Sequence, residues 1–372
     1  MDEIKVVLFG VGGYAANYIH TIKNPIRPGV RLVGAVDPYI GECELCPVYA
    51  SADELFAHHQ ADLAVVSTPI HFHPEHAVTA FEHGCHVLME KPIASTMESV
   101  GEILKARDKA GKKLGIGFQL CADKVVRAVK ADVDAGLYGA PVSLKAIVLW
   151  PRDHAYYHRS CGWAGKRYDA QGRPIFDNVL SNATAHYLMN MLYMTGKPLT
   201  SLHCATFRAN AIETFDTAVM KGQSETGAGV FIAVSHAADP ARRQAPVLEY
   251  TYEKGIIRMN RAGADDEHIT AELPDGSVRN YGLAAQGYME CFWNMIDAIR
   301  DEAPIACPGE TAALHVDTLQ KMRAIEPEAT PFPAAWLRET DGFTWVPGLA
   351  EKLYQCFDTA RLPEWDLNAG HL

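Results

Sequence analysis

The sequence has no long apolar run, no internal repeat and no low-complexity tract. Because a membrane-spanning helix needs about 20 consecutive apolar residues, we expect no membrane partner. The chain also has no excess of basic residues, and its formal net charge is −11. Nucleic-acid-binding proteins normally carry a basic patch or stripe, so we expect no nucleic-acid partner either.

The nine cysteines are odd in number and scattered, and no signal peptide precedes them. This pattern predicts a reducing, cytoplasmic location. Cys43 and Cys46 form a C-x-x-C pair without a second pair at zinc-finger spacing, which favours a surface loop over a redox role. His71, His73 and His76 lie too close together in a predicted turn to converge on a metal, and no cysteine or carboxylate cluster completes a ligand set. We therefore expect no metal.

What remains is typical of a soluble α/β protein. With 372 residues, 48% of them hydrophobic and 21% charged, the chain can bury two substantial cores. Strand-like runs alternate with helical segments at the amino-terminal end, which predicts a doubly wound parallel sheet. The predicted strands are 4–9, 31–36, 62–66, 86–89 and 113–117, and a helix is predicted at 96–110.

A glycine-rich motif, G-x-G-x-x-A, follows the first of these strands directly. Gly10 suits a tight turn, Gly12 lets the backbone approach a pyrophosphate, and Ala15 lets the helix pack on the strand. The free N–H groups at the helix start favour phosphate. The second strand ends in Asp37, whose carboxylate would bond ribose hydroxyls and repel a 2′-phosphate, so NAD is predicted over NADP. The alternative is an aspartate that only caps the turn before Pro38.

Polar turns also follow the next two strands. Ser67 and Thr68 follow one, and Glu90-Lys91-Pro92 follows the other. Open α/β sheets bind ligands at the carboxyl ends of their strands, and proline would fix the backbone that presents the lysine. In isolation the tripeptide is more typical of a solvated Glu-Lys pair, so its context decides the interpretation.

In combination these segments resemble the Gfo/Idh/MocA family of oxidoreductases, which includes glucose–fructose oxidoreductase and inositol dehydrogenase. The resemblance spans nearly the whole chain and is strongest at 10–13, Asp37, 67–73 and 84–94. Ile70 departs from the asparagine or proline that members often have there. The resemblance implies a Rossmann domain, a second α+β domain with an open-faced, mostly antiparallel sheet, and a homo-oligomer, either dimer or tetramer, built on that face.

The resemblance also implies roles for individual residues. Lys91 would lie against the nicotinamide ribose and the reacting substrate, and Glu90 and Thr68 would help to hold the cofactor. The residues that we expect to contact NAD are Gly10, Gly12, Gly13, Tyr14, Ala15, Asp37, Ser67, Thr68, His71, His73, Glu90, Lys91 and Gln119.

In the second half, a helical segment is predicted at 182–192, running to Gly196. Residues four apart share a helix face, so Asn182 and His186 should project together. The resemblance implies a catalytic role for His186 and an aspartate where this chain has Asn182. Histidine can accept a hydroxyl proton as hydride leaves the same carbon. Asparagine cannot stabilise an imidazolium by charge, so we expect Lys91 to take a larger share of proton transfer and Asn182 to bind substrate.

The stretch 150–167 is too polar to be core and is rich in aromatic and basic residues. Aromatic faces stack on sugar rings, and charged side chains bind hydroxyls or carboxylates, which favours a sugar-like or polyol substrate. Tyr157, Trp163 and Lys166 are the predicted substrate ligands. The alternative is a surface or oligomer-contact loop, because tyrosine, tryptophan and arginine also mark interfaces.

Three segments are predicted: an NAD-binding Rossmann domain at 1–121, a substrate-binding and oligomerisation domain at 122–345, and a helical extension at 346–372. The later helices are predicted at 123–135, 288–300, 310–325 and 347–359, and the later strands at 142–149, 202–207, 216–221, 229–235, 248–252, 255–260 and 268–273.

The predicted function is hydride transfer between a nicotinamide and a secondary hydroxyl or ketone of a sugar, polyol or glycoside. The first alternative is a glycoside-cleaving enzyme that retains NAD and works by transient sugar oxidation and elimination. The second is a sensor on the same fold, which would be expected to lose Lys91 or His186.

Overall fold

The computed structural model describes residues 3–159, 162–242, 245–260, 268–284 and 289–372. The chain divides into two compact units, one formed by 1–122 with 287–313 and the other by 123–286 with 314–372. We call them the first and the second unit. This division differs from the three consecutive segments predicted from the sequence, because 287–313 packs with the first unit and 346–372 is part of the second.

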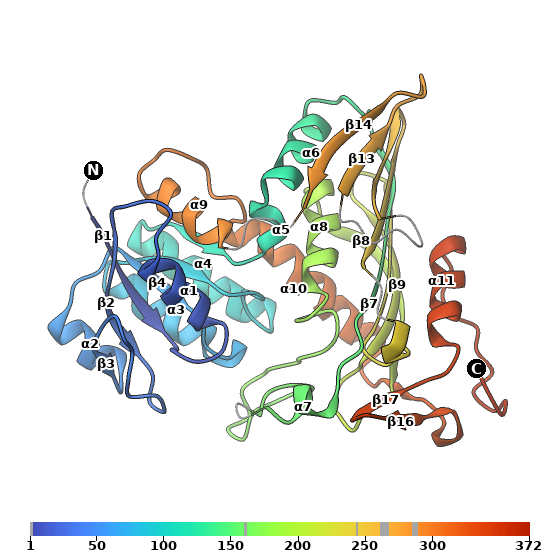
Figure 1. Ribbon diagram of the computed structural model, residues 1–372, viewed down its shortest axis with the longest axis horizontal. Coiled ribbons are helices and arrows are strands. Elements are labelled where there is room, and N and C mark those ends of the chain that lie inside the picture. Colours follow the sequence, from blue (N-terminus) through green and yellow to red (C-terminus); the bar gives the residue numbers. More distant parts are fainter. Residues whose placement is uncertain (1–2, 160–161, 243–244, 261–267, 285–288) are drawn as a thin grey trace. The chain divides into compact units, whose positions relative to one another are not determined.

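The first unit is built on a six-stranded sheet in the order β3-β2-β1-β4-β5-β6. Figure 1 labels the strands β1 to β4 of this sheet. All neighbouring strands are parallel, which confirms the predicted doubly wound sheet. The two-residue β3 was not predicted, since so short a run carries no periodicity. The strands are β1 (Ile4–Phe9), β2 (Val30–Val36), β3 (Val48–Tyr49), β4 (Leu63–Val66), β5 (His86–Met89) and β6 (Leu114–Ile116).

Helices follow most of these strands, with ends that local residues explain. Thr96 accepts a hydrogen bond from the N–H of Ser99 at the start of α4, and Gly111 ends that helix with a φ of +63°. The α-helices of the first unit are α1 (Ala15–Lys23), α2 (Ala52–His58), α3 (His73–Glu82), α4 (Met97–Ala110), α5 (Gln119–Ala122) and α9 (Glu290–Ile299), and a short 3₁₀ helix, η1 (Ile70–Phe72), precedes α3.

Helix α9 brings a distant part of the sequence into the core of the first unit. Phe292 and Ile296 are fully buried there, and the Phe292 ring centre lies 5.9 Å from that of Tyr18. Arg27 forms an ion pair with Asp297 at 2.8 Å. A helix is predicted here from the sequence, but within the second domain. Periodicity identifies an apolar face without showing which sheet that face covers. Tyr288, the predicted first residue of the helix, lies outside the described residues.

The second unit contains a nine-stranded sheet in the order β14-β13-β12-β11-β7-β10-β9-β8-β15. Its pairs are antiparallel except for β7 with β10 and β8 with β15, so the predicted mostly antiparallel sheet is confirmed. The strands are β7 (Pro141–Leu149), β8 (Leu199–Arg208), β9 (Thr217–Ser224), β10 (Gly229–Ser235), β11 (Val247–Tyr252), β12 (Gly255–Met259), β13 (His268–Glu272), β14 (Val278–Leu283) and β15 (Thr330–Pro331).

Helices lie on both faces of this sheet. Figure 1 shows α6 and α8 on one face and α11 on the other. Leu353 and Phe357 of α11 join a buried cluster with Ile147 and Phe231 of the sheet. The carboxyl-terminal segment of the chain therefore covers part of the face on which the resemblance places subunit contacts.

The remaining elements are α6 (Lys124–Asp134), α7 (His154–Tyr157), α8 (Ala185–Thr195), α10 (Gly309–Ile325), α11 (Leu349–Thr359), η2 (Pro240–Arg242), η3 (Ala334–Trp336) and a hairpin of β16 (Arg338–Thr340) and β17 (Phe343–Trp345). Within the described residues, no helix combines the length and apolar character needed to cross a membrane.

Candidate functional site

The predicted cofactor residues meet along one edge of the first unit's sheet. The register aligns the last residues of β2, β1, β4 and β5 side by side. The residue after each strand therefore falls in one row across the sheet, in the order Asp37, Gly10, Ser67 and Glu90. Parallel sheets bind ligands outside this edge. We call these four residues, with the turns that follow them, the carboxyl-edge row.

The glycine motif after β1 has the backbone that its sequence requires. Gly10 has a φ of +88°, and a Cβ there would lie 3.0 Å from the Ser67 carbonyl oxygen. A Cβ on Gly12 would lie 2.9 Å from Ile40 Cδ1. Ala15 is fully buried at the start of α1. Larger residues at these positions would strain the backbone or push the loop away from its neighbours.

Asp37 holds this loop and the next one together. Its carboxylate accepts hydrogen bonds from the backbone N–H groups of Val11 at 3.0 Å, Tyr39 at 2.9 Å and Ile40 at 3.0 Å. The turn-capping role considered as an alternative for this residue is thus present. It does not exclude the predicted ribose contact, because each carboxylate oxygen has two lone pairs and the side chain is partly exposed.

Glu90 is tied to the core of the first unit. Tyr18 is 1% exposed, and its hydroxyl donates a hydrogen bond to Glu90 Oε1 at 2.7 Å. Burial raises the pKa of Glu90, and the hydrogen bond from Tyr18 and the charge of Lys91 oppose that rise. Burial also raises the pKa of Tyr18 well above its usual range. Lys91 follows Glu90, is partly exposed, and precedes Pro92 through a cis peptide bond.

His73 has a different place from the one predicted. Its side chain is 1% exposed, with Nδ1 2.9 Å from the Pro92 carbonyl oxygen and Nε2 2.9 Å from that of Thr68. Burial lowers the pKa of His73 to about 4. The neutral ring carries one N–H, so it donates to one of these carbonyls and packs closely on the other. In this position His73 joins two turns of the carboxyl-edge row and is shielded from direct contact with a cofactor.

Other predicted cofactor residues lie nearby. Gln119 Nε2 donates a hydrogen bond to the Tyr14 hydroxyl, which links the starts of α5 and α1. Thr68 Oγ1 lies 3.0 Å from His76 Nδ1, and the His71 and Phe72 ring centres are 4.3 Å apart. In the part of the chain that the structure describes, no three or more histidine, cysteine or acidic side chains are grouped as metal ligands.

The predicted start of this helix at Asn182 is wrong. Helix α8 begins at Ala185, so His186 lies in its first turn while Asn182 precedes it. Asn178 explains the late start, because its Oδ1 accepts the N–H groups of Leu180 and Ser181, each at 2.9 Å. Such side-chain bonds compete with helix formation. The Asn182 amide instead donates to the Tyr156 hydroxyl at 3.2 Å.

Asn182 thereby joins a group of basic and aromatic side chains in the second unit. Trp150 and His236 directly follow the parallel neighbours β7 and β10. The Arg159 guanidinium carbon lies 3.9 Å from the Tyr156 ring centre and 4.5 Å from that of Trp163. We call the group the Arg–aromatic cluster; it comprises Trp150, Arg152, Tyr156, Tyr157, Arg159, Trp163, Asn182 and His236.

The predicted substrate residues Tyr157 and Trp163 both belong to this cluster. The Tyr157 hydroxyl lies 3.1 Å from His236 Nδ1. The sequence interpretation did not select Arg152, Tyr156, Arg159 or His236. The first three share the visible alternation of basic and aromatic residues. His236 has no local signal, since it is 79 positions away from Tyr157 and approaches it only through the sheet.

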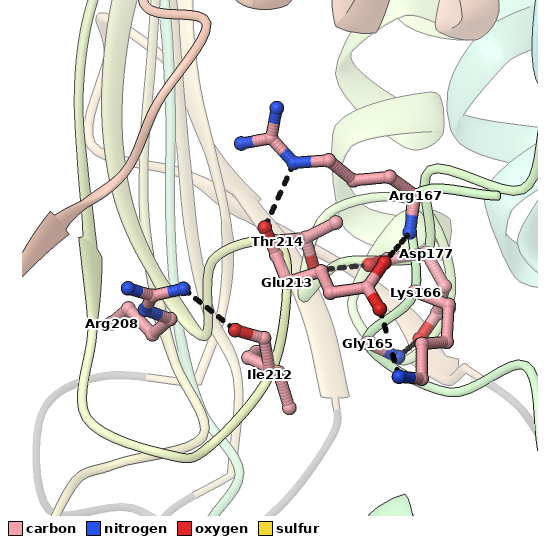
Figure 2. Close-up of polar contacts among 8 residues, drawn as sticks. All are labelled: Gly165, Lys166, Arg167, Asp177, Arg208, Ile212, Glu213 and Thr214. Carbon is pink, nitrogen blue, oxygen red and sulfur yellow. Dashed lines mark hydrogen bonds and ion pairs between the residues drawn. The ribbon is translucent and has the colours of Figure 1, made fainter.

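Lys166 does not join the cluster through its observed contacts. Figure 2 shows its ammonium paired with Glu213, at 2.8 Å from Oε1. Arg167 donates its N–H to Glu213 Oε2 and its Nε–H to the Glu213 carbonyl, both at 2.9 Å. The Thr214 hydroxyl donates to the Asp177 carbonyl. Lys166 thus helps to attach the segment 165–177 to the loop 212–214, where an exposed ion pair contributes only about 0–1 kcal/mol.

The family comparison concerns the first unit. Residues 4–118 match the Gfo/Idh/MocA model, described as an oxidoreductase family with an NAD-binding Rossmann fold. The chain is 32% identical over 144 residues to 1,5-anhydro-D-fructose reductase of Ensifer adhaerens, covering 38% of this chain and 41% of that protein. It is 29% identical over 155 residues to inositol 2-dehydrogenase 1 of Mycolicibacterium vanbaalenii, covering 40% and 45%. These matches span less than half of either relative.

Likeness of fold extends further. The crystal structure of the WlbA dehydrogenase from Bordetella pertussis, a complex with NADH and UDP-GlcNAcA, matches with a TM-score of 0.71 at 23% identity. The match covers 87% of this chain and 96% of that one. It includes both units and shows a common architecture. Residues 4–118 therefore match the model of the Gfo/Idh/MocA oxidoreductase family, described as an NAD-binding Rossmann fold, and the likeness to the solved structure shows the fold.

Proposed function

We propose that the protein is an NAD-dependent oxidoreductase that transfers hydride between the nicotinamide and a secondary hydroxyl or ketone of a sugar, polyol or glycoside. The observation that carries the proposal is the carboxyl-edge row, in which Lys91, next to Glu90 after β5, lies along the same sheet edge as the glycine loop and Asp37. The names of the two curated relatives, a sugar reductase and a polyol dehydrogenase, support this substrate class.

The residues of the row fit the dinucleotide. Gly12 has no side chain, so its backbone can approach a pyrophosphate at the start of α1. Asp37 would accept ribose hydroxyls while repelling a 2′-phosphate. Once bound, NAD would supply the hydride acceptor, and the protein would supply orientation and electrostatics.

Two side chains are proposed to handle the proton. Lys91 would lie next to the reacting carbinol, where its amine would accept the hydroxyl proton during oxidation and return it during reduction. His186 would serve as the second proton acceptor from the first turn of α8. Asn182 is engaged with Tyr156 in the turn before that helix. Asparagine stands where the resemblance implies an aspartate, and a neutral amide cannot stabilise an imidazolium by charge, which is the basis for assigning Lys91 the larger share of proton transfer.

The test is a panel of sugars, polyols and glycosides offered with NAD or NADP to the full-length chain. Absorbance of reduced nicotinamide and the masses of the products are measured together. We expect reduction with NAD and a loss of turnover of about 10²–10⁴-fold in Lys91→Met, the range for a general acid–base group. Lys105→Met is the matched control, because Lys105 is exposed on α4.

Each outcome has a defined meaning. Near-full activity of Lys91→Met would contradict the catalytic assignment, and reduction with neither cofactor would contradict the oxidoreductase. Cleaved glycoside without net reduction of NAD would instead support the cofactor-retaining mechanism. His186→Gln, compared with the exposed His203→Gln, tests the second proton acceptor in the same assay.

We also propose a homo-oligomer, either a dimer or a tetramer. The proposal follows the family resemblance, and the sheet face that would carry the contacts is partly covered by α11. Light scattering on the purified chain tests it, and a monomer at micromolar concentration would refute it.

A further inference from the structure

One guanidinium in the Arg–aromatic cluster is held in place but not neutralised by the residues around it. Arg159 stacks with Tyr156 and Trp163, and its Nε–H donates to the Tyr156 carbonyl at 2.8 Å. Its Nη2 is shielded from solvent and has no hydrogen-bond partner within the described residues. A buried, charged donor left in this state is costly, so this edge of the guanidinium is suited to receive an acceptor.

His236 supplies a second observation of the same kind. Its side chain is 2% exposed, and its Nδ1 lies 3.1 Å from the Tyr157 hydroxyl. Its Nε2 has no partner among the residues described. Burial, together with the charges of Arg152 and Arg159, lowers the pKa of His236 to about 3. The neutral ring can carry its one proton on Nε2 while Nδ1 accepts from Tyr157, which provides another N–H donor.

A second cation lies in the same cluster. The guanidinium carbons of Arg152 and Arg159 lie 5.0 Å and 3.9 Å from the same Tyr156 ring centre, so they are no farther apart than these two distances combined. Both charges also lower the pKa of His236, so positive charge gathers around this ring and would attract an anion beside it.

Two buried carboxylates are near the cluster and are committed to backbone donors. Asp177 accepts the N–H of Gly165 at 2.7 Å, and Asp216 accepts the N–H groups of Ala209 and Asn210, the latter at 2.7 Å. Asp177 and Asp216 both influence the titration of Tyr157, which places them within electrostatic reach. They balance part of the positive charge of the cluster.

We propose that Arg159, with Arg152 and His236, binds an anionic group carried by the substrate. The inference rests on the proposed function and narrows its substrate class to acidic sugars or polyols that bear a carboxylate or a phosphate. A guanidinium held between two rings is preorganised, and its fork of N–H groups matches the two oxygens of such a group. Asn182, bonded to Tyr156 in the same cluster, would contact the sugar part.

The experiment measures binding and turnover separately, using the full-length chain saturated with NAD. Calorimetric titrations use a neutral polyol, myo-inositol, and two anionic probes, D-glucuronate and glucose 6-phosphate. We expect an anionic probe to bind more tightly than the neutral one. Its affinity should fall as salt is added, because salt screens the charges. Arg159→Gln should lower the affinity for the anionic probe by about 10–100-fold, as expected for the loss of hydrogen bonds to a charged group. The affinity for myo-inositol should not change.

Two further variants control for folding and for charge alone. Arg279→Gln is the matched control, because Arg279 also stacks on a tyrosine, 5.0 Å from the Tyr281 ring centre, but pairs with Asp132 at 3.0 Å. It should bind every probe as the unaltered chain does. Arg159→Lys keeps the charge but not the fork, so it should recover only part of the lost affinity.

The two anionic probes distinguish the source of the charge, since a site shaped for one should prefer it. Failure of both to bind more tightly than myo-inositol, or unchanged anion binding in Arg159→Gln, would overturn the inference. Reduction of NAD in the same solutions keeps the two proposals apart. Oxidation of myo-inositol without any preference for anions would uphold the proposed function and refute the anion site. Arg159-dependent anion binding without reduction of NAD would uphold the anion site and refute the proposed function.

Discussion

The hydrogen bond from Tyr18 to Glu90 offers a stringent test of how the first unit supports the carboxyl-edge row. Tyr18→Phe removes only the hydroxyl, because the ring keeps its packing against Phe292, 5.9 Å away, and Tyr14, 6.0 Å away. The lost bond, 2.7 Å long, goes to a carboxylate whose pKa burial already raises. Hydrogen bonds to charged groups contribute about 1.5–3 kcal/mol, so we expect unfolding to become easier by about that amount above neutral pH.

The raised pKa of Glu90 determines whether the free energy of unfolding rises or falls with pH. Because the pKa of Glu90 is raised in the folded chain, the folded state binds the proton more tightly than the unfolded state. The free energy of unfolding therefore falls as the pH rises from the ordinary glutamate pKa through the raised one. The Tyr18 hydrogen bond opposes this fall, so its removal should cost more at a pH above the raised pKa of Glu90 than at a pH below it, where a neutral carboxyl group leaves about 0.5–1.5 kcal/mol.

Thermal unfolding of both chains at the two pH values is the assay. At about 2–4 °C per kcal/mol for a domain of 150–250 residues, we expect the melting temperature to fall by about 3–12 °C above neutral pH and by less in acid. Glu90→Gln supplies the control: in that background Tyr18→Phe should cost only what a neutral hydrogen bond contributes. Equal losses at both pH values, or an undiminished loss in the Glu90→Gln background, would refute the reasoning.

Three further substitutions test the same unit. Gly10→Ala places a Cβ at a φ of +88°, 3.0 Å from the Ser67 carbonyl oxygen, and should lower the free energy of unfolding by at least about 1 kcal/mol. Chemical unfolding measures this change, and an unchanged midpoint would contradict the prediction. Asp37→Ala leaves three backbone N–H groups without their acceptor and should lower the affinity for NAD by about tenfold or more. Fluorescence titration measures this affinity, and an unaltered value would rule out a role for Asp37 in cofactor binding. Phe292→Ala, at a fully buried ring, should cost about 3–5 kcal/mol; a loss under 1 kcal/mol, measured by urea unfolding, would mean that α9 is not integral to this core.

Much of the first unit could be predicted because its signals are local. Parallel strands read as short apolar runs, the glycine motif fixes its own turn, and strand ends in one sheet share an edge, so the sequence alone places Asp37 and Glu90 in one region. The tertiary assignment of α9 could not be predicted, because its apolar face fits any sheet. Strand β14 was missed because its residues are mostly exposed and show no alternation.

In the second unit the errors come from side chains that override simple periodicity. The spacing of Asn182 and His186 predicts a shared helix face, but the hydrogen bonds of Asn178 delay the helix. Lys166 looked like a ligand for substrate, whereas Glu213, 47 positions away, supplies its partner. His236 completes the Arg–aromatic cluster from a distant strand end, and only pairing of β7 with β10 brings it there.

The most direct test of the central claim follows the hydride itself. A substrate found in the panel is prepared with deuterium on the reacting carbinol carbon and incubated with NAD and the full-length chain. We predict that the reduced nicotinamide gains one deuterium by mass spectrometry and that Lys91→Met slows this gain by about 10²–10⁴-fold. Product formed while the cofactor stays oxidised and unlabelled, or a label that enters the cofactor at an unchanged rate in Lys91→Met, would contradict the account.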